Sequence, residues 1–242
     1  MILGRARRRR AAGRGLHEDR GRLAALLLVR WPTDHGRVPG DATDVQMEAI
    51  ADLAENYSFD ELRVTHEQNL VLPHVRLDDL KTVYDRLKDH ELATPNLGLI
   101  SDAIACPGLD YCNLANARSL PLADRIFQHF ADAGLRDEIG KIRLNISGCI
   151  NACGHHHAAD IGILGVNKKG VENYQISLGG RAGEDAAVGR ILGPSFDEHR
   201  VPDAVAAIVG LYLHRRKPDE SFGDAVARLG VDVFKRELYA AA

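Results

Sequence analysis

The chain has 242 residues, of which 45% are hydrophobic and 27% are charged, a composition typical of soluble globular proteins and not of disordered or membrane-spanning chains. Thirty-one basic residues against 34 acidic ones give a net charge of -3, which argues against nucleic acid as a partner because such a protein needs a basic surface. Four cysteines are too few for a disulfide scaffold. We expect one or two domains, no membrane association, and a cytoplasmic location in which the thiols stay reduced.

The amino-terminal residues differ in character from the rest of the chain. The segment MILGRARRRRAAGRG holds six arginines and no acid. We interpret residues 1–22 as an arginine-rich, disordered extension, with a nucleic-acid-binding arm and an export signal as alternatives. The export signal is disfavoured because the apolar run at residues 23–29 is short, follows two acids and precedes no small-residue cleavage pattern.

Residues 23–95 have the pattern of a small α/β unit in the order βαββα, which is half of a ferredoxin-like sandwich. Apolar periodicity and turn residues set the expected elements. These elements are a strand over residues 23–30, a helix capped by Thr43 or Asp44, strands over residues 61–66 and 70–75, and a helix over residues 77–90. The side chains expected in the core are Val45, Met47, Ile50, Leu53 and Ala54 in the first helix and Leu80, Val83, Tyr84 and Leu87 in the second.

Residues 96–242 read as a second unit, of mixed α/β type, so that the fold class expected for the whole chain is α+β. A loop rich in proline and glycine opens this unit, and an alternating strand and two further strands follow its first helix. The expected elements are a helix over residues 119–133 with Leu122, Ile126, Phe127 and Phe130 inward, strands over residues 141–147, 160–166 and 174–178, and helices over residues 201–215, 224–229 and 231–239.

The four cysteines fall into two pairs. Five residues separate Cys106 from Cys112, and three separate Cys149 from Cys153. The first gap is too wide for the usual zinc knuckle, and the C-x-x-C of thioredoxin-type redox proteins is absent. Two pairs on glycine-containing loops suit an iron-sulfur cluster, which takes four thiolates from around an inorganic core. Four unrelated buried thiols are the alternative.

Three segments resemble the sulfite and nitrite reductases that couple siroheme to a [4Fe-4S] cluster, most closely the assimilatory haemoprotein type. They are ACPGLDYCNLANA at residues 105–117, NISGCINACGHHHAADIGILG at residues 145–165 and RVTHEQNLVL at residues 63–72. The resemblance covers residues 23–242 and implies a ferredoxin-like half-domain at residues 23–95 followed by a siroheme and iron-sulfur domain at residues 96–242.

The resemblance also implies roles for the cysteines. Cys106, Cys112, Cys149 and Cys153 would ligate the cluster, and Cys153 would in addition bridge it to the siroheme iron as the catalytic axial thiolate. Such coupling would deliver electrons one at a time for the six-electron reduction of sulfite to sulfide or of nitrite to ammonia. The electron donor would be a ferredoxin or an NADPH-dependent flavoprotein.

Other residues are weaker candidates for binding the siroheme. Backbone N–H groups and cations near a glycine turn could bind its carboxylates, or could be an ordinary surface turn. Asparagines beside the cysteines could donate hydrogen bonds near sulfur, or act as local caps. The candidates are Thr65, Gln68, Asn69, Asn145, Asn151, Lys168, Lys169, Gly179, Gly180, Arg181 and Gly183.

The three consecutive histidines at residues 155–157 would alternate in direction along an extended chain, which disfavours a zinc site made from them alone. Asp102 and Asp110 are possible catalytic acids, although no paired carboxylate spacing supports them.

The family has two such half-domains, and this sequence shows one. We therefore expect the chain to be the carboxy-terminal portion of a reductase, with a missing amino-terminal half as a possible partner for its exposed sheet. Two other functions are open: a haem-free iron-sulfur electron carrier, and an inactive remnant without cofactor.

Overall fold

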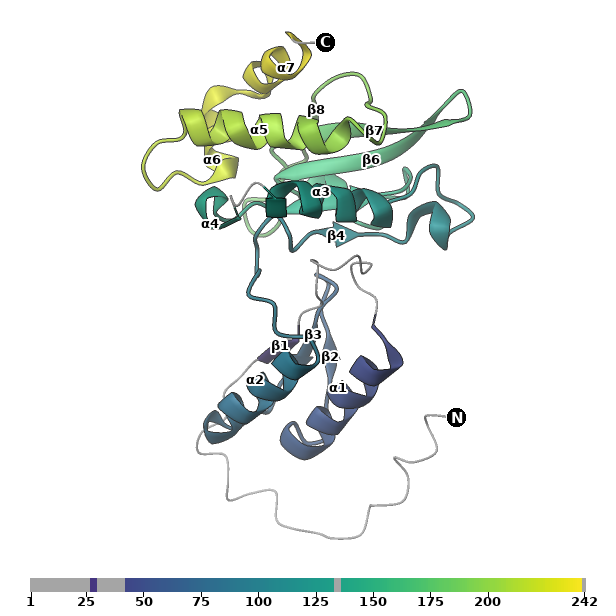
Figure 1. The fold of residues 1–242 in the computed structure, drawn as a ribbon. Helices are drawn as coiled ribbons and strands as arrows, with labels where there is room; N and C mark the ends of the chain where they lie inside the picture. Colours follow the sequence, from purple (N-terminus) through teal and green to yellow (C-terminus); the bar gives the residue numbers. More distant parts are fainter. Residues whose placement is uncertain (1–26, 30–41, 133–135, 241–242) are drawn as a thin grey trace.

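The computed structural model describes residues 27–29, 42–132 and 136–240, which form two units along the chain (Figure 1). The predictions for residues 1–22, and most of the first predicted strand, lie outside these residues. The α+β class expected from the sequence is confirmed, because each unit combines a sheet with helices.

The first unit is a three-stranded antiparallel sheet with two helices beside it (Figure 1). The strand order is β1-β3-β2, which is the connectivity expected of a βαββα half-domain. Both β2 and β3 are shorter than predicted: β2 ends at Val64, before the turn that starts at Thr65, and β3 ends at Leu72, before a turn at residues 73–74. The elements are β1 (Leu27–Val29), α1 (Asp44–Tyr57), β2 (Arg63–Val64), β3 (Leu70–Leu72) and α2 (Leu80–Asp89), with a short 3-10 turn η3 (Leu77–Asp79) before α2.

The predicted cap of the first helix is present. Thr43 Oγ1 accepts a hydrogen bond from the Gln46 N–H at 3.2 Å, and Gln46 Oε1 accepts one from the Thr43 N–H at 3.1 Å, which together form a capping box. Gln46 Nε2 also donates to the carbonyl of His90 at 3.0 Å. This buried amide therefore joins the start of α1 to the end of α2.

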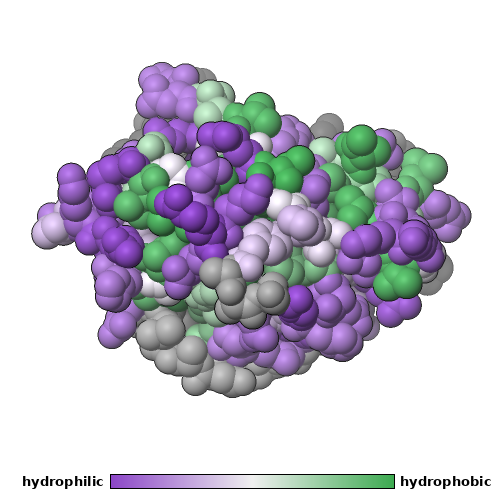
Figure 2. Space-filling view, turned by 90° about the horizontal axis from the view of Figure 1, so that it is seen from above, coloured by the Kyte–Doolittle hydropathy of each residue, from purple (hydrophilic) through white to green (hydrophobic). Residues whose placement is uncertain are grey.

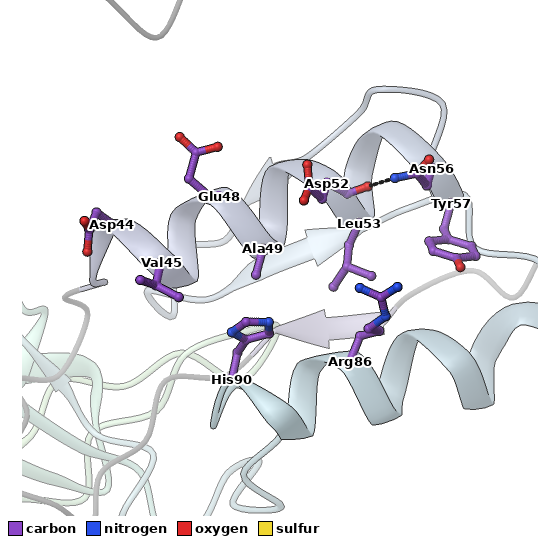
Figure 3. Close-up of a pocket in the computed structure, with 10 residues that line it drawn as sticks. All are labelled: Asp44, Val45, Glu48, Ala49, Asp52, Leu53, Asn56, Tyr57, Arg86 and His90. Atoms are coloured by element: carbon purple, nitrogen blue, oxygen red, sulfur yellow. Dashed lines mark hydrogen bonds between the residues drawn. The ribbon is translucent and has the colours of Figure 1, made fainter.

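Three side chains expected in the core of this unit are exposed instead. Val45, Met47 and Tyr84 are 60%, 55% and 44% exposed. The helix α1 turns Ile50 and Leu53 toward the sheet, and residues at neighbouring positions point away from that row because a helix has 3.6 residues per turn. Val45 lines an open pocket of about 760 Å³ between α1 and α2 (Figure 3).

The second unit is a five-stranded mixed sheet with helices packed against it (Figure 1). The strand order is β4-β5-β6-β7-β8, with β4, β5 and β6 parallel and β6, β7 and β8 antiparallel. The strands are β4 (Ile104–Ala105), β5 (Leu144–Ser147), β6 (Ile161–Lys168), β7 (Val171–Leu178) and β8 (Arg190–Ile191), and the helices are α3 (Leu120–Asp132), α4 (Arg136–Ile139), α5 (Val201–Arg215), α6 (Phe222–Leu229) and α7 (Val231–Ala240).

The larger hydrophobic core lies in this unit. Leu122, Ile126, Phe127 and Phe130 of α3 are buried in it, as predicted. The strand β5 does not alternate between buried and exposed residues, because all four of its residues are buried. A parallel strand in the middle of a sheet is covered on both faces, and this places two polar side chains, Asn145 and Ser147, inside the protein.

A side chain links the two units. Gln68 donates from Nε2 to the Ala105 carbonyl at 2.9 Å and accepts at Oε1 from the Ala105 N–H at 3.1 Å. Two hydrogen bonds to one residue restrict position more than one does, so the β2–β3 turn of the first unit is fixed against β4 of the second.

Seen from the side of α7 (Figure 2), the surface mixes hydrophilic residues with several separate hydrophobic groups. In the described part of the chain, every helix is too short or too polar to cross a membrane.

The difference in burial between two leucines predicts that truncation of the buried one lowers the stability of the protein much more than truncation of the exposed one. Leu122 is 0% exposed and Leu97 is 61% exposed. We expect Leu122→Ala to lower the free energy of unfolding by about 2–5 kcal/mol through lost burial and a cavity. The matched change Leu97→Ala should cost less than about 1 kcal/mol. Urea denaturation of both variants measures this, and equal losses would contradict the placement of the core.

Candidate metal centre

The two cysteine pairs follow two neighbouring parallel strands. Cys106 comes directly after β4, and Cys149 comes two residues after the end of β5. The register pairs Ala105 with Ile146, and the Cys106 N–H donates to the Ile146 carbonyl at 3.1 Å. Because parallel strands end at the same edge of a sheet, both cysteine loops leave the sheet side by side.

Hydrogen bonds join the two loops beyond the sheet. The Gly148 N–H donates to Cys106 Sγ at 3.0 Å. The Gly148 carbonyl accepts from the N–H groups of Asn116 and Ala117 at 2.8 and 3.1 Å. Both backbone groups of Gly148 therefore bind the loop of the first pair, next to Cys149 of the second.

Close backbone packing explains the small residues in these loops. A Cβ atom on Gly148 would lie 2.7 Å from the Ala117 carbonyl oxygen and 2.9 Å from the Gly108 Cα. On the strand β6, a Cβ atom on Gly165 would lie 2.7 Å from the Ala117 Cβ and 2.9 Å from the Gly148 oxygen. The approach of the two loops to each other and to β6 thus requires glycine at these positions.

The four thiols are free, and none of them forms a disulfide. Cys149 is buried, Cys106 and Cys112 are half-buried, and Cys153 is exposed. Cys106 Sγ also lies 3.4 Å from Ser119 Oγ. A reduced thiol that accepts a backbone hydrogen bond, as Cys106 does from Gly148, is suited to bind metal as a thiolate, since such a bond stabilises negative charge on sulfur.

Within residues 42–132 and 136–240, no three histidine, cysteine, aspartate or glutamate side chains lie in a group that could hold one metal ion. A mononuclear site needs its donors to converge on a single point. A cubane cluster is larger, and each cysteine binds a different iron atom at its corners. Free thiols are the donor type that such a cluster takes, and here they lie on two adjoining loops.

The second cysteine loop is a tight turn on the end of β5. The Ala152 N–H donates to the Cys149 carbonyl at 3.1 Å, and Ala152 has φ 56°. The Gly154 N–H donates to Ser147 Oγ at 3.2 Å, and Asn145 Nδ2 donates to the Gly154 carbonyl at 2.9 Å. Sequence reasoning did not single out Ser147, although a hydroxyl in a buried strand was a signal that could have found it.

The three histidines lie in a turn and not in an extended chain, so the premise of alternating directions was wrong. His155 is left-handed with φ 53°, and a 3-10 turn, η5 (His156–Ala158), follows it. The His157 ring centroid lies 5.4 Å from that of His156 and 6.3 Å from that of His155. Burial lowers the pKa of His156, with a smaller contribution from His157, which favours the neutral ring.

The glycine turn after β7 packs against the histidine turn. A Cβ atom on Gly180 would lie 2.5 Å from the His157 carbonyl oxygen, and the Gly179 N–H donates to the Asp160 carbonyl at 3.1 Å. Arg181 pairs with Asp224 on α6, with Nη2 3.1 Å from Oδ1. Of the remaining candidates of this group, Lys168 is exposed at the end of β6, and Lys169 and Gly183 lie exposed in loops, as does Asn151 between the second pair of cysteines.

The half-domain candidates form the turn between β2 and β3. The Thr65 N–H donates to the Asn69 carbonyl at 2.8 Å, and Thr65 Oγ1 accepts from the Asn69 N–H at 3.2 Å. Gln68 has φ 59° at the tip of this turn, from which its amide reaches Ala105, the residue before Cys106. The turn therefore lies next to the first cysteine loop.

Both aspartates near the first pair have local partners. Asp102 Oδ2 accepts from the Gly98 N–H at 2.8 Å, and Asp110 lies 3.7 Å from Arg118 Nε. Neither contact joins them to each other as a catalytic carboxylate pair would require.

The pocket between α1 and α2 is separate from the cysteines. Figure 3 shows Val45, Ala49 and Leu53 of α1 facing Arg86 of α2 and His90, the residue after α2, across the gap. All of the residues that line it belong to the first unit.

Two family descriptions match the chain. Residues 100–241 match the nitrite and sulphite reductase 4Fe-4S domain, and residues 27–90 match the nitrite/sulfite reductase ferredoxin-like half domain.

Named relatives agree with these matches. The chain is 32% identical over 188 residues to the chloroplastic ferredoxin–nitrite reductase of Betula pendula, covering 73% of this chain and 30% of that protein. It is 32% identical over 193 residues to the NADPH sulfite reductase hemoprotein beta-component of Chromohalobacter salexigens, covering 76% and 32%. The chain spans about a third of the length of these curated relatives.

Solved structures show the same fold. The structure of the Mycobacterium tuberculosis NirA protein superposes with a TM-score of 0.71 at 27% identity, over 86% of this chain and 39% of that one. A dissimilatory sulfite reductase I structure gives a TM-score of 0.67 at 13% identity, over 88% and 68%, which is a likeness of fold alone.

The resemblance inferred from three short segments is thereby confirmed across both units. The chain belongs to the nitrite and sulphite reductase family, a family of oxidoreductases, with a ferredoxin-like half-domain followed by a 4Fe-4S domain.

Proposed function

We propose that Cys106, Cys112, Cys149 and Cys153 ligate one [4Fe-4S] cluster. The observation that supports this most directly is the hydrogen bond from the Gly148 N–H to Cys106 Sγ at 3.0 Å. It places Cys106 of the first pair in contact with Gly148, the residue that precedes Cys149 of the second pair. A backbone donor to sulfur also favours the thiolate and raises the reduction potential of a cluster bound there.

We further propose that the chain forms the carboxy-terminal part of a reductase that converts sulfite to sulfide or nitrite to ammonia. Siroheme bound through the Cys153 thiolate would supply single-electron transfer between the cluster and the substrate, as a six-electron reduction requires. Cys153 suits this role because it is exposed while the other three thiols are buried or half-buried.

The rest of the siroheme site is proposed to be shared with other parts of the reductase. The turn at Gly179 and Gly180 presents backbone next to the histidine turn, and Thr65 and Asn69 lie in the turn that Gln68 fixes beside the first cysteine loop. Arg181 is already paired with Asp224. Carboxylates of the macrocycle would therefore need further cations, which a separate amino-terminal half could provide.

The electron donor is proposed by analogy with the relatives, whose names specify ferredoxin or NADPH. In both cases electrons would enter one at a time through the cluster. The substrate, sulfite or nitrite, would be reduced at the siroheme that Cys153 would hold.

The absorption spectrum of the anaerobically purified full chain tests the proposed function. Cluster and siroheme together should give strong Soret and red bands over a broad shoulder, with iron, sulfide and tetrapyrrole found by analysis. A broad shoulder alone would support a haem-free electron carrier. A folded, monodisperse chain that takes up no iron would contradict both metal-binding functions.

Replacement of Cys153 tests the proposed bridge. We expect Cys153→Ser to lose the spectroscopic coupling between cluster and siroheme, because a serine hydroxyl does not provide a bridging thiolate. Stability without cofactor should change by less than about 0.5 kcal/mol, since the side chain is exposed. Electron paramagnetic resonance of the reduced protein measures the coupling. Ile150→Ser, in the same loop at an 83% exposed position, is the control, and coupling that survives in Cys153→Ser would rule out the bridge.

The contact between the two loops predicts a specific effect of one added methyl group. In Gly148→Ala the new Cβ would lie 2.7 Å from the Ala117 carbonyl oxygen, so the loops must move apart, at a cost of about 1–3 kcal/mol. We expect the iron content after reconstitution to fall well below that of the unmodified chain.

Gly210→Ala is the matched control, because a Cβ there meets nothing within 4 Å and alanine favours the helix α5 by about 0.5–1 kcal/mol. Equal iron contents in the two variants would show that the contact of the loops does not form the site.

A further inference from the structure

Gly154, the residue after Cys153, is bound through both of its backbone groups by side chains from β5. Asn145 Nδ2 donates to its carbonyl at 2.9 Å, and Ser147 Oγ accepts from its N–H at 3.2 Å. A third, longer bond runs from Asn145 Nδ2 to the His155 carbonyl at 3.4 Å. The backbone on the carboxyl side of Cys153 is therefore attached to the sheet and not to the loop alone.

The two side chains that bind Gly154 are themselves held firmly. Asn145 and Ser147 are two residues apart on one strand, so both point to the same face of the sheet. They are 8% and 0% exposed, and β5 has β4 on one side and β6 on the other. Gly154 lies so close to the Ile146 carbonyl that a Cβ atom would overlap it. The attachment point is thus rigid and specific for glycine.

The backbone around Cys153 needs such support. Ala152 and His155 have φ values of 56° and 53°, in the left-handed region that costs a residue other than glycine about 1–2 kcal/mol. Such conformations persist where surrounding contacts enforce them. Cys153 itself is exposed, so the direction of its thiol depends on the backbone on either side.

We propose that Asn145 and Ser147 are positioning residues for the Cys153 thiolate, acting through Gly154. This inference rests on the proposed function, in which Cys153 is a metal ligand. Without the two side chains the turn would relax and would hold the Cys153 sulfur less firmly toward a bound cluster. The bond between this sulfur and iron would then open more often. Neither side chain is required to touch the cluster, and both act by fixing the peptide that follows the ligand.

The test compares three variants of the full chain, reconstituted anaerobically with ferrous iron and sulfide. Asn145→Ala removes the amide donor, and Ser147→Ala removes the hydroxyl acceptor with a smaller change of volume. Asn96→Ala is the matched control, because Asn96 is also buried, at 4% exposed, and its Nδ2 also donates to a backbone carbonyl, that of Ser101, at 3.0 Å. That hydrogen bond lies in a different loop.

Two measurements report on the cluster itself and not on catalysis. They are the rate of iron release to bathophenanthroline and the electron paramagnetic resonance spectrum of the reduced cluster. Loss of a hydrogen bond worth about 1 kcal/mol should speed iron release about fivefold in Asn145→Ala and in Ser147→Ala, with altered g values. Asn96→Ala should lose thermal stability but keep the iron-release rate and spectrum of the unmodified chain.

The outcomes separate this inference from the proposed function. If the unmodified chain takes up no cluster, the proposed function fails, and the positioning role fails with it. If the unmodified chain binds a cluster but both β5 variants match it in iron release and spectrum, the positioning role alone is overturned. An equal effect of Asn96→Ala would overturn it too, because the changes would then follow general stability. Ser147→Ala keeps the test decisive if Asn145→Ala does not fold.

Discussion

The parallel pairing of β4 with β5 is the constraint on which the cysteine site depends. The register that aligns Ala105 with Ile146 brings Cys106 to the end of β5 and sets both cysteine loops at one edge of the sheet. From there Gly148 binds the first loop through both its N–H and its carbonyl. Segments more than 30 residues apart in the chain thus become one local structure.

Most of the architecture could be predicted because periodicity and caps are local signals. Thr43 was one of the two cap candidates for α1, the α5 boundaries at residues 201 and 215 were predicted correctly, and the inward face of α3 was named residue by residue. Val45 was misplaced because local periodicity did not reveal the open pocket between α1 and α2. The strand β5 was expected to alternate between buried and exposed residues. All four of its residues are buried, because elements distant in the sequence cover its second face as well.

The cysteine donors of the candidate site could be predicted from the sequence, but the hydrogen bonds that hold their loops in place could not. Cysteine spacing and glycine content are visible in one dimension, whereas the hydrogen bonds of Ser147 and Asn145 to Gly154 depend on how a loop folds back onto its own strand. The same is true of Gln68, whose amide pairs with Ala105 across the two units. The histidine run was misjudged because a left-handed residue at His155 starts a turn there.

We propose that the two cysteine loops enclose a single cluster. An anaerobic crystal structure of the reconstituted chain, with data collected at the iron absorption edge, tests it most directly. We predict one compact anomalous peak beside the ends of β4 and β5, contacted by the sulfur atoms of Cys106, Cys112, Cys149 and Cys153. Iron bound elsewhere, or a peak that contacts the cysteines of only one pair, would contradict a cluster shared by the two loops.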